Sequence, residues 1–73
     1  MELAAAPDRP NLTIRRGPDG RPIVVIAFAY DPKIVHRVRQ IPRRRFEWDT
    51  REWWAPVDVW TGLEIRNLLA EFP

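Results

Sequence analysis

The chain has 73 residues, a formal net charge of +2 and no cysteine. A chain of this length forms one domain and buries only roughly 60% of the surface that it exposes when unfolded, so we expect modest stability. The composition excludes disulfides and thiolate metal sites, and the longest apolar run, residues 23–30, is far shorter than the ~20 residues of a membrane span.

Residues 1–10 are rich in alanine and proline and lack the basic start of a signal peptide, so we predict a disordered tail before a domain over 11–73. Asn11 to Arg16 alternates polar and apolar residues, as a half-buried strand does. The next residues, Gly17-Pro18-Asp19-Gly20-Arg21, predict a three-residue hairpin turn with a bulge. Proline fixes φ at the second turn position, and Gly20 accepts a left-handed backbone.

A second strand is predicted over Pro22 to Tyr30, a run of β-branched and aromatic residues that is apolar on both faces. This pattern is typical of a strand that is covered on both faces or lies centrally in a sheet. In the favoured register, one face of the hairpin carries Leu12, Ile14, Val24, Ile26 and Phe28.

A helix is predicted from Asp31-Pro32, because aspartate caps free backbone amides and proline suits the first helical position. Pro42 ends it. The apolar stripe facing the core consists of Ile34, Val35, Val38 and Ile41. The residues predicted to face solvent are Lys33, His36, Arg37, Arg39 and Gln40.

A second hairpin is predicted around a tip at Thr50-Arg51. This register pairs Trp48 with Trp53 and Phe46 with Ala55 on one face. The other face then carries Arg45, Glu47 and Trp54.

A last helix is predicted after Asp58 as cap, with Thr61 and Glu64 at capping-box spacing as an alternative start. Its apolar stripe is Ile65, Leu68, Leu69 and Phe72. The elements together predict a single small α+β domain of order ββαββα, with one small antiparallel sheet and two helices.

The sequence offers little for catalysis. It contains no serine or cysteine, one lysine and one histidine, so an activated nucleophile beside a base is not expected. His36 has no metal-binding neighbour at helical spacing, Asp49 and Asp58 fit turn and cap roles, and no Gly-rich phosphate loop exists. We therefore expect a domain that is not itself an enzyme and that holds no metal or cofactor.

Positive charge is concentrated in eleven arginines, several of which run from the first helix into the loop after it. Guanidinium groups bind phosphates bidentately, and an exposed tryptophan stacks on unpaired bases. The residues predicted to contact DNA are Lys33, Arg37, Arg39, Arg43, Arg44, Arg45, Arg51 and Trp54. Two alternatives stay open: an arginine surface that is merely solvated or paired with Glu47 or Glu52, and a docking surface for an acidic protein.

From Phe28 to Pro56 the chain reads FAYDPKIVHRVRQIPRRRFEWDTREWWAP. This stretch resembles the HARP (HepA-related protein) domain found beside SNF2-type motors in annealing helicases, and is similar to the damage-recognition domains of XPB-type helicases. The matching positions are Tyr30, Asp31, Pro32, Val35, Ile41, Pro42, Arg44, Arg45, Phe46, Thr50, Arg51 and Trp53.

The resemblance implies a compact ββαββα-like domain that engages branched, forked or damaged DNA and directs an attached ATP-driven motor to it. The arginines and Trp54 by themselves suit an exposed single strand or a junction. The resemblance also implies that Phe46 and Trp53 anchor the core while Arg44 and Arg45 face phosphate. We expect a monomer whose partners are DNA and a helicase motor domain in the same chain, with no membrane. The location expected is cytoplasmic and nucleoid-associated in a bacterium, or nuclear in a eukaryote.

Overall fold

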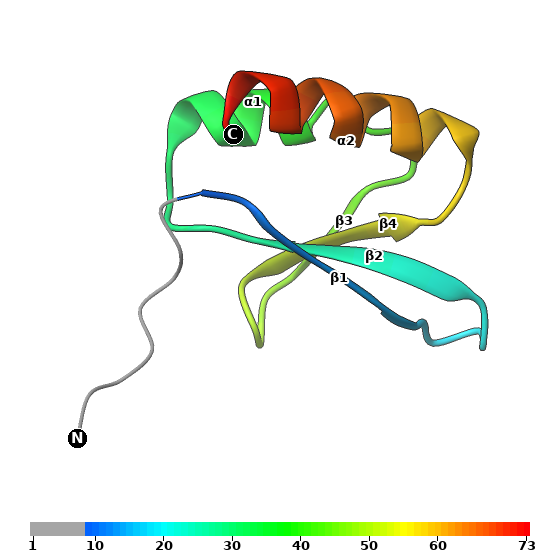
Figure 1. Ribbon diagram of the computed structural model, residues 1–73. Coiled ribbons are helices and arrows are strands. Elements are labelled where there is room, and N and C mark those ends of the chain that lie inside the picture. The colour runs from blue at the N-terminus through cyan, green and yellow to red at the C-terminus, as the bar shows by residue number, and fades with distance from the viewer. Residues whose placement is uncertain (1–8) are drawn as a thin grey trace.

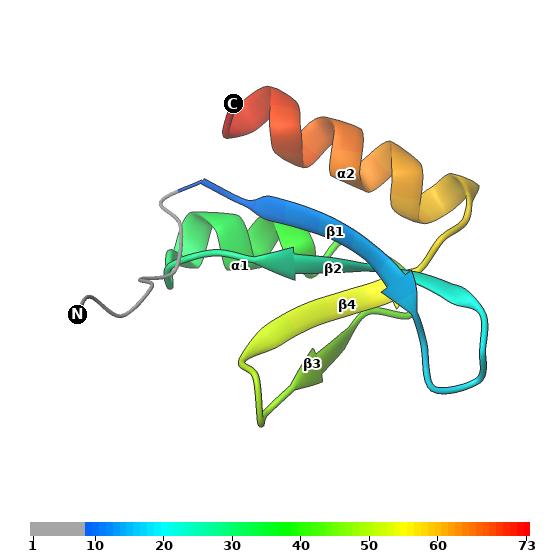
Figure 2. The same cartoon turned by 60° about the horizontal axis from the view of Figure 1, so that its bottom comes forward.

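The computed structural model describes residues 9–73, so the predicted tail lies almost wholly outside the described range. The elements are β1 (Asn11–Arg16), β2 (Pro22–Ala27), α1 (Pro32–Val38), β3 (Arg45–Glu47), β4 (Glu52–Pro56) and α2 (Val59–Glu71). The strands form one antiparallel sheet in the order β1-β2-β4-β3, with β2 and β4 at its centre (Figure 2). Both helices lie on one face of this sheet (Figure 1). The predicted α+β class and ββαββα order are confirmed.

The first hairpin has the predicted turn. The Gly17 N–H donates to the carbonyl of Arg21 at 2.7 Å, and the Gly20 N–H donates to the carbonyl of Gly17 at 3.0 Å. Gly20 takes a left-handed backbone with φ of 85°. The register pairs Leu12 with Ile26, as well as Ile14 with Val24, so the predicted shared face is confirmed.

The first hairpin turn requires glycine at position 17, because a larger residue would not fit there. A Cβ at this position would lie 2.7 Å from Cγ2 of Ile23 and 3.1 Å from the carbonyl oxygen of Arg21, so Gly17→Ala forces the turn to shift. We expect a loss of about 1–3 kcal/mol in the free energy of unfolding, measured by urea denaturation. Gly62→Ala is the control, because a Cβ there meets nothing within 4 Å and alanine favours the helix by about 1 kcal/mol. Equal effects of the two changes would contradict the close packing of this turn.

The second strand ends at Ala27, so the prediction that it continues to Tyr30 is wrong. Ala27 pairs with Asn11 at the start of β1, and the pairing with β4 ends at Ile26, so neither neighbouring strand pairs with β2 beyond Ala27. Tyr30 is 81% exposed. As predicted for a central strand, β2 has four consecutive buried residues, Ile23, Val24, Val25 and Ile26.

Helix α1 begins as predicted and ends early. The Asp31 side chain accepts from the Lys33 N–H at 2.9 Å, and Pro32 is the first helical residue. The helix ends at Val38, after which the Ile41 N–H donates to the carbonyl of Val38 three residues back. This tight turn still carries Ile41 into the core, where it is fully buried.

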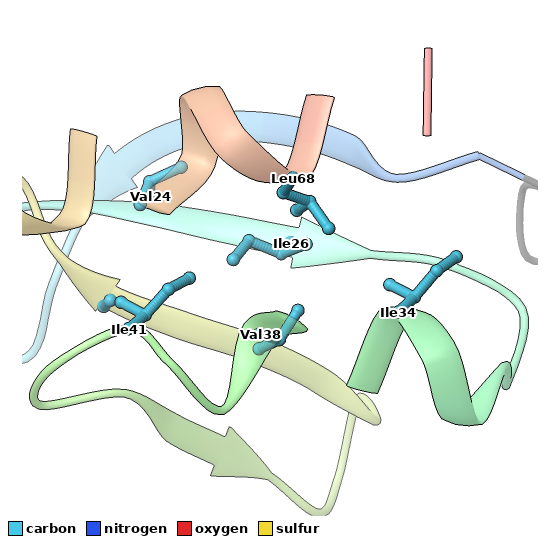
Figure 3. Packing of buried hydrophobic residues seen from close by; sticks show 7 residues of the cluster. Val24, Ile26, Ile34, Val38, Ile41 and Leu68 are labelled. Atoms are coloured by element: carbon cyan, nitrogen blue, oxygen red, sulfur yellow. The ribbon is translucent and has the colours of Figure 1, made fainter. Parts of the chain in front are cut away.

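The core lies between the sheet and the two helices (Figure 3). It consists of Val24, Ile26, Ile34, Val38, Ile41, Ala55 and Leu68. On α2, Leu68 is fully buried whereas Leu69 is 40% exposed. The prediction that Leu69 belongs to the apolar stripe facing the core is therefore wrong. The inward line runs instead through Thr61, Ile65, Leu68 and Phe72, spaced by four, three and four residues.

The second hairpin has a different register from the one predicted. Phe46 pairs with Trp53 rather than with Ala55, and Trp48 lies in the connecting loop, 80% exposed. The loop closes earlier because Arg51 adopts a left-handed backbone with φ of 58°, and its N–H donates to the carbonyl of Glu47 at 2.7 Å. The slip is two residues, so the side chains that remain in the strands keep their predicted face of the sheet, whereas Trp48 leaves it.

Candidate nucleic-acid interface

Trp54 lies in the middle of the sheet face opposite the helices. It stands directly between Val25 of β2 and Arg45 of β3, and these three side chains point to the same face. Val25 is only 4% exposed although neither helix covers it. Its direct neighbours on this face are the half-buried Trp54 of β4 and Thr13 of β1. Arg15 of β1 also reaches across β2 to Glu52 of β4 in a 3.0 Å ion pair. Trp54 is therefore both a packing residue and part of the surface.

A basic hollow adjoins Trp54. Its volume of about 690 Å³ lies within the range of roughly 300–1,000 Å³ typical of ligand sites. Four arginines from two separate segments reach this hollow, and Asp19 is the one carboxylate among its lining residues. The lining consists of Pro18, Asp19, Arg21, Pro22, Ile23, Arg43, Arg44, Arg45, Trp54 and Pro56. We refer to it as the basic hollow.

The segment 42–45 delivers three of these arginines. After Pro42 the chain turns from the helical layer to the edge of the sheet, and Arg43 makes this turn in a left-handed conformation with φ of 58°. The side chain of Arg43 forms an ion pair with Asp58 and remains 64% exposed. Arg44 donates to the carbonyl of Ile41 at 3.5 Å, and Arg45 begins β3.

The other residues predicted to contact DNA do not line the basic hollow. Lys33 and Arg39 are exposed in the helical layer, and Arg51 is exposed at the tip of the second hairpin. Arg37 is engaged with α2, where it pairs with Glu71 at 2.7 Å and with Glu64 at 4.0 Å. The structure thus brings Arg43, Arg44 and Arg45 together with Trp54, and places the α1 residues on another layer.

Sequence reasoning missed Arg21. This arginine ends the turn of the first hairpin, and it reaches the basic hollow because the start of β2 lies beside the end of β4, where Ile23 pairs with Pro56. That pairing joins segments more than thirty residues apart, and no local pattern in the sequence predicts it. Only the register of β2 against β4 would have indicated that Arg21 lies at the basic hollow.

A second hollow lies on the other side of Trp54 and has the opposite charge balance. It carries two arginines and three carboxylates, Arg15, Arg16, Glu47, Asp49 and Glu52. Glu47 pairs directly with Glu52 across the β3–β4 ladder, an arrangement that is unfavourable between like charges. We refer to it as the acidic hollow.

Asp58 connects the basic hollow to α2. Its side chain caps the helix by accepting from the Thr61 N–H at 2.8 Å, and it also pairs with Arg43. The hydrogen bond from the Thr61 backbone, aided by the charge of Arg43, holds the pKa of Asp58 below its usual range.

This lowered pKa predicts an acid-sensitive cap. The stabilising contribution is complete above the ordinary aspartate pKa of about 4, and is lost as the pH falls through the lower value of the folded state. Asp58→Asn keeps a capping side chain that does not titrate, so we expect it to lose less stability between pH 5 and pH 2 than the unaltered protein, measured by urea denaturation. Identical acid profiles would contradict this role of Asp58.

A third hollow lies on the helical side and is lined by Pro42, Trp60, Leu63, Glu64, Arg66 and Asn67. Trp60 is 63% exposed there, on the opposite layer from Trp54. It provides a tryptophan against which the contribution of Trp54 can be compared.

Comparison with models of protein families, with curated proteins and with solved structures finds no match to this chain. Among residues 9–73, no helix is long and apolar enough to cross a membrane. Within the same range, no group of three or more histidine, aspartate or glutamate side chains is placed to hold a metal ion.

Proposed function

We propose that this chain is a non-catalytic DNA-binding accessory domain of an ATP-driven DNA motor of the helicase type. It binds single-stranded, branched or damaged DNA with the sheet face that carries Trp54. The observation that carries the proposal is the basic hollow, which four arginines line together with one half-buried tryptophan.

The chemistry of these two residue types matches the two parts of an unpaired strand. Guanidinium groups engage phosphate oxygens bidentately and release condensed counterions, whatever the base sequence. The ring of Trp54 offers a face on which a base stacks, worth about 1–3 kcal/mol. In duplex DNA the bases are already stacked, so the tryptophan favours forks, gaps and single strands.

The link to a motor rests on the resemblance of residues 28–56 to the HARP domain. In that pattern Arg44 and Arg45 belong to the basic loop, and both line the basic hollow in this chain. The phosphate contacts that we propose are Arg21, Arg43, Arg44 and Arg45, with Trp54 as the stacking residue. Lys33, Arg39 and Arg51 contribute a positive field outside this set.

The test is an amide chemical-shift titration with single-stranded, forked and blunt duplex DNA at about 150 mM salt, where the Debye length is ~8 Å. We expect shifts in residues 21–25 and 43–45 and at the Trp54 indole, larger with single-stranded and forked DNA than with blunt duplex. The competing function, docking to an acidic protein, uses the same arginines but leaves the tryptophan idle. An absence of shifts with every DNA would rule out DNA binding and favour that competitor.

A salt titration measures the phosphate contacts. Arg44→Ala combined with Arg45→Ala should weaken binding of single-stranded DNA and flatten the slope of log K against log salt by up to about 1.4, since each lost contact removes ~0.7. The matched control, Arg39→Ala combined with Arg66→Ala, removes the same charge from the helical layer and should leave the slope nearly unchanged. Equal slopes in the two double variants would remove the basic hollow from the site.

A further inference from the structure

The two hollows beside Trp54 differ sharply in charge. The basic hollow holds four arginines and one aspartate, whereas the acidic hollow holds two arginines and three carboxylates. Each hollow has one arginine in an ion pair, Arg43 with Asp58 and Arg15 with Glu52. The other charges are three arginines and one aspartate in the basic hollow, and one arginine and two carboxylates in the acidic hollow. Trp54 lines both hollows, so it stands at the boundary between attraction and repulsion for phosphate.

Two of the three carboxylates of the acidic hollow are free to repel an anion. Glu47 and Asp49 are exposed, and among residues 9–73 neither forms an ion pair. Glu47 ends β3 and Asp49 lies in the hairpin loop, so unpaired negative charge is concentrated where β3 meets this loop. A DNA phosphate placed in the acidic hollow is therefore repelled more strongly than it is attracted.

The difference in charge between the two hollows limits how a DNA strand can bind at Trp54. With one base stacked on the indole, the phosphate on one side of that nucleotide lies over the basic hollow. If the strand continued past the tryptophan, its next phosphate would enter the acidic hollow. A nucleotide at the end of a strand has no such phosphate to place.

We infer that the sheet face opposite the helices recognises the end of a single DNA strand. The terminal base stacks on Trp54, and the rest of the strand passes over the basic hollow. This inference rests on the proposed DNA-binding function and specifies the form of DNA that the site selects. The acidic hollow acts as the selector, because it excludes strands that run on.

The test compares a linear oligonucleotide with a covalently closed circle of the same sequence at about 150 mM salt. The circle has more than about 40 nucleotides, well above the roughly 4–16 that a single-strand site contacts, so its curvature is no obstacle. We expect the circle to bind about tenfold more weakly than the linear strand. Equal affinities would overturn the inference and leave the proposed function standing, whereas no binding of either DNA would overturn both.

The combined change Glu47→Gln and Asp49→Asn isolates the selector. Both side chains are exposed, so the fold should tolerate their neutralisation. The two lost charges raise general attraction to both ligands, and the ratio of the two affinities is therefore the readout. We expect the ratio to fall from about tenfold to within about twofold. A ratio that stays at the value of the unaltered protein would show that the discrimination arises elsewhere, which would overturn the inference.

Discussion

Leu68→Ala should lower the free energy of unfolding by about 2–5 kcal/mol, the range for removal of a fully buried leucine. Leu68 has no exposed surface, and it comes from α2 into the cluster that joins both helices to the sheet. A 73-residue domain has a total stability of roughly 4–11 kcal/mol, so this one change removes a large part of it. Urea denaturation followed by far-UV circular dichroism measures the effect.

Leu69→Ala is the matched control. It makes the same chemical change one residue further along α2, where the side chain is 40% exposed. The two variants share the same gain in helix propensity, so the difference between them reports burial alone. We expect a loss of no more than about 1 kcal/mol for Leu69→Ala. If the two variants unfolded at the same urea concentration, the placement of α2 on the sheet would be wrong.

Trp54→Leu should weaken the binding of single-stranded DNA by about 5- to 150-fold, the equivalent of the 1–3 kcal/mol that stacking one base contributes. Leucine keeps apolar cover over Val25, so the sheet is expected to stay folded while the aromatic face is lost. A thermal melt of the variant checks its fold, and fluorescence anisotropy of a labelled oligonucleotide measures its affinity.

Trp60→Leu serves as the control for this change. Trp60 is a second accessible tryptophan, but it lies on α2 and does not line the basic hollow. Its replacement should change the affinity less than twofold. Undiminished binding by a folded Trp54→Leu protein would contradict base stacking and would leave the arginines as the groups that hold the DNA.

The elements of this fold could be predicted because their signals are local. Asp31 and Asp58 cap the two helices, Gly17 and Gly20 form the first turn, and the apolar run 23–26 marks the central strand. Each of these features depends on residues within a few positions of one another, so the chain alone specifies them.

The structural predictions that were wrong concern features that depend on which residues are neighbours in space. β2 stops at Ala27 because its pairing with both partner strands ends there, and Leu69 is exposed because the inward line of α2 begins at Thr61. The register of the second hairpin depends on Arg51, which has a left-handed backbone that is uncommon for residues other than glycine. The conformational preference of arginine does not predict such a backbone.

The sequence by itself determined the types of residue at the candidate site and the face on which Trp54 and Arg45 lie, because side chains alternate along a strand. Only the tertiary structure decided which charges surround that tryptophan. Pairing of β2 with β4 brought Arg21 to the basic hollow, and the packing of α1 against α2 drew Arg37 to Glu71. The physical reason is that charges act over distances in space, and folding places them there through contacts between segments far apart in the chain.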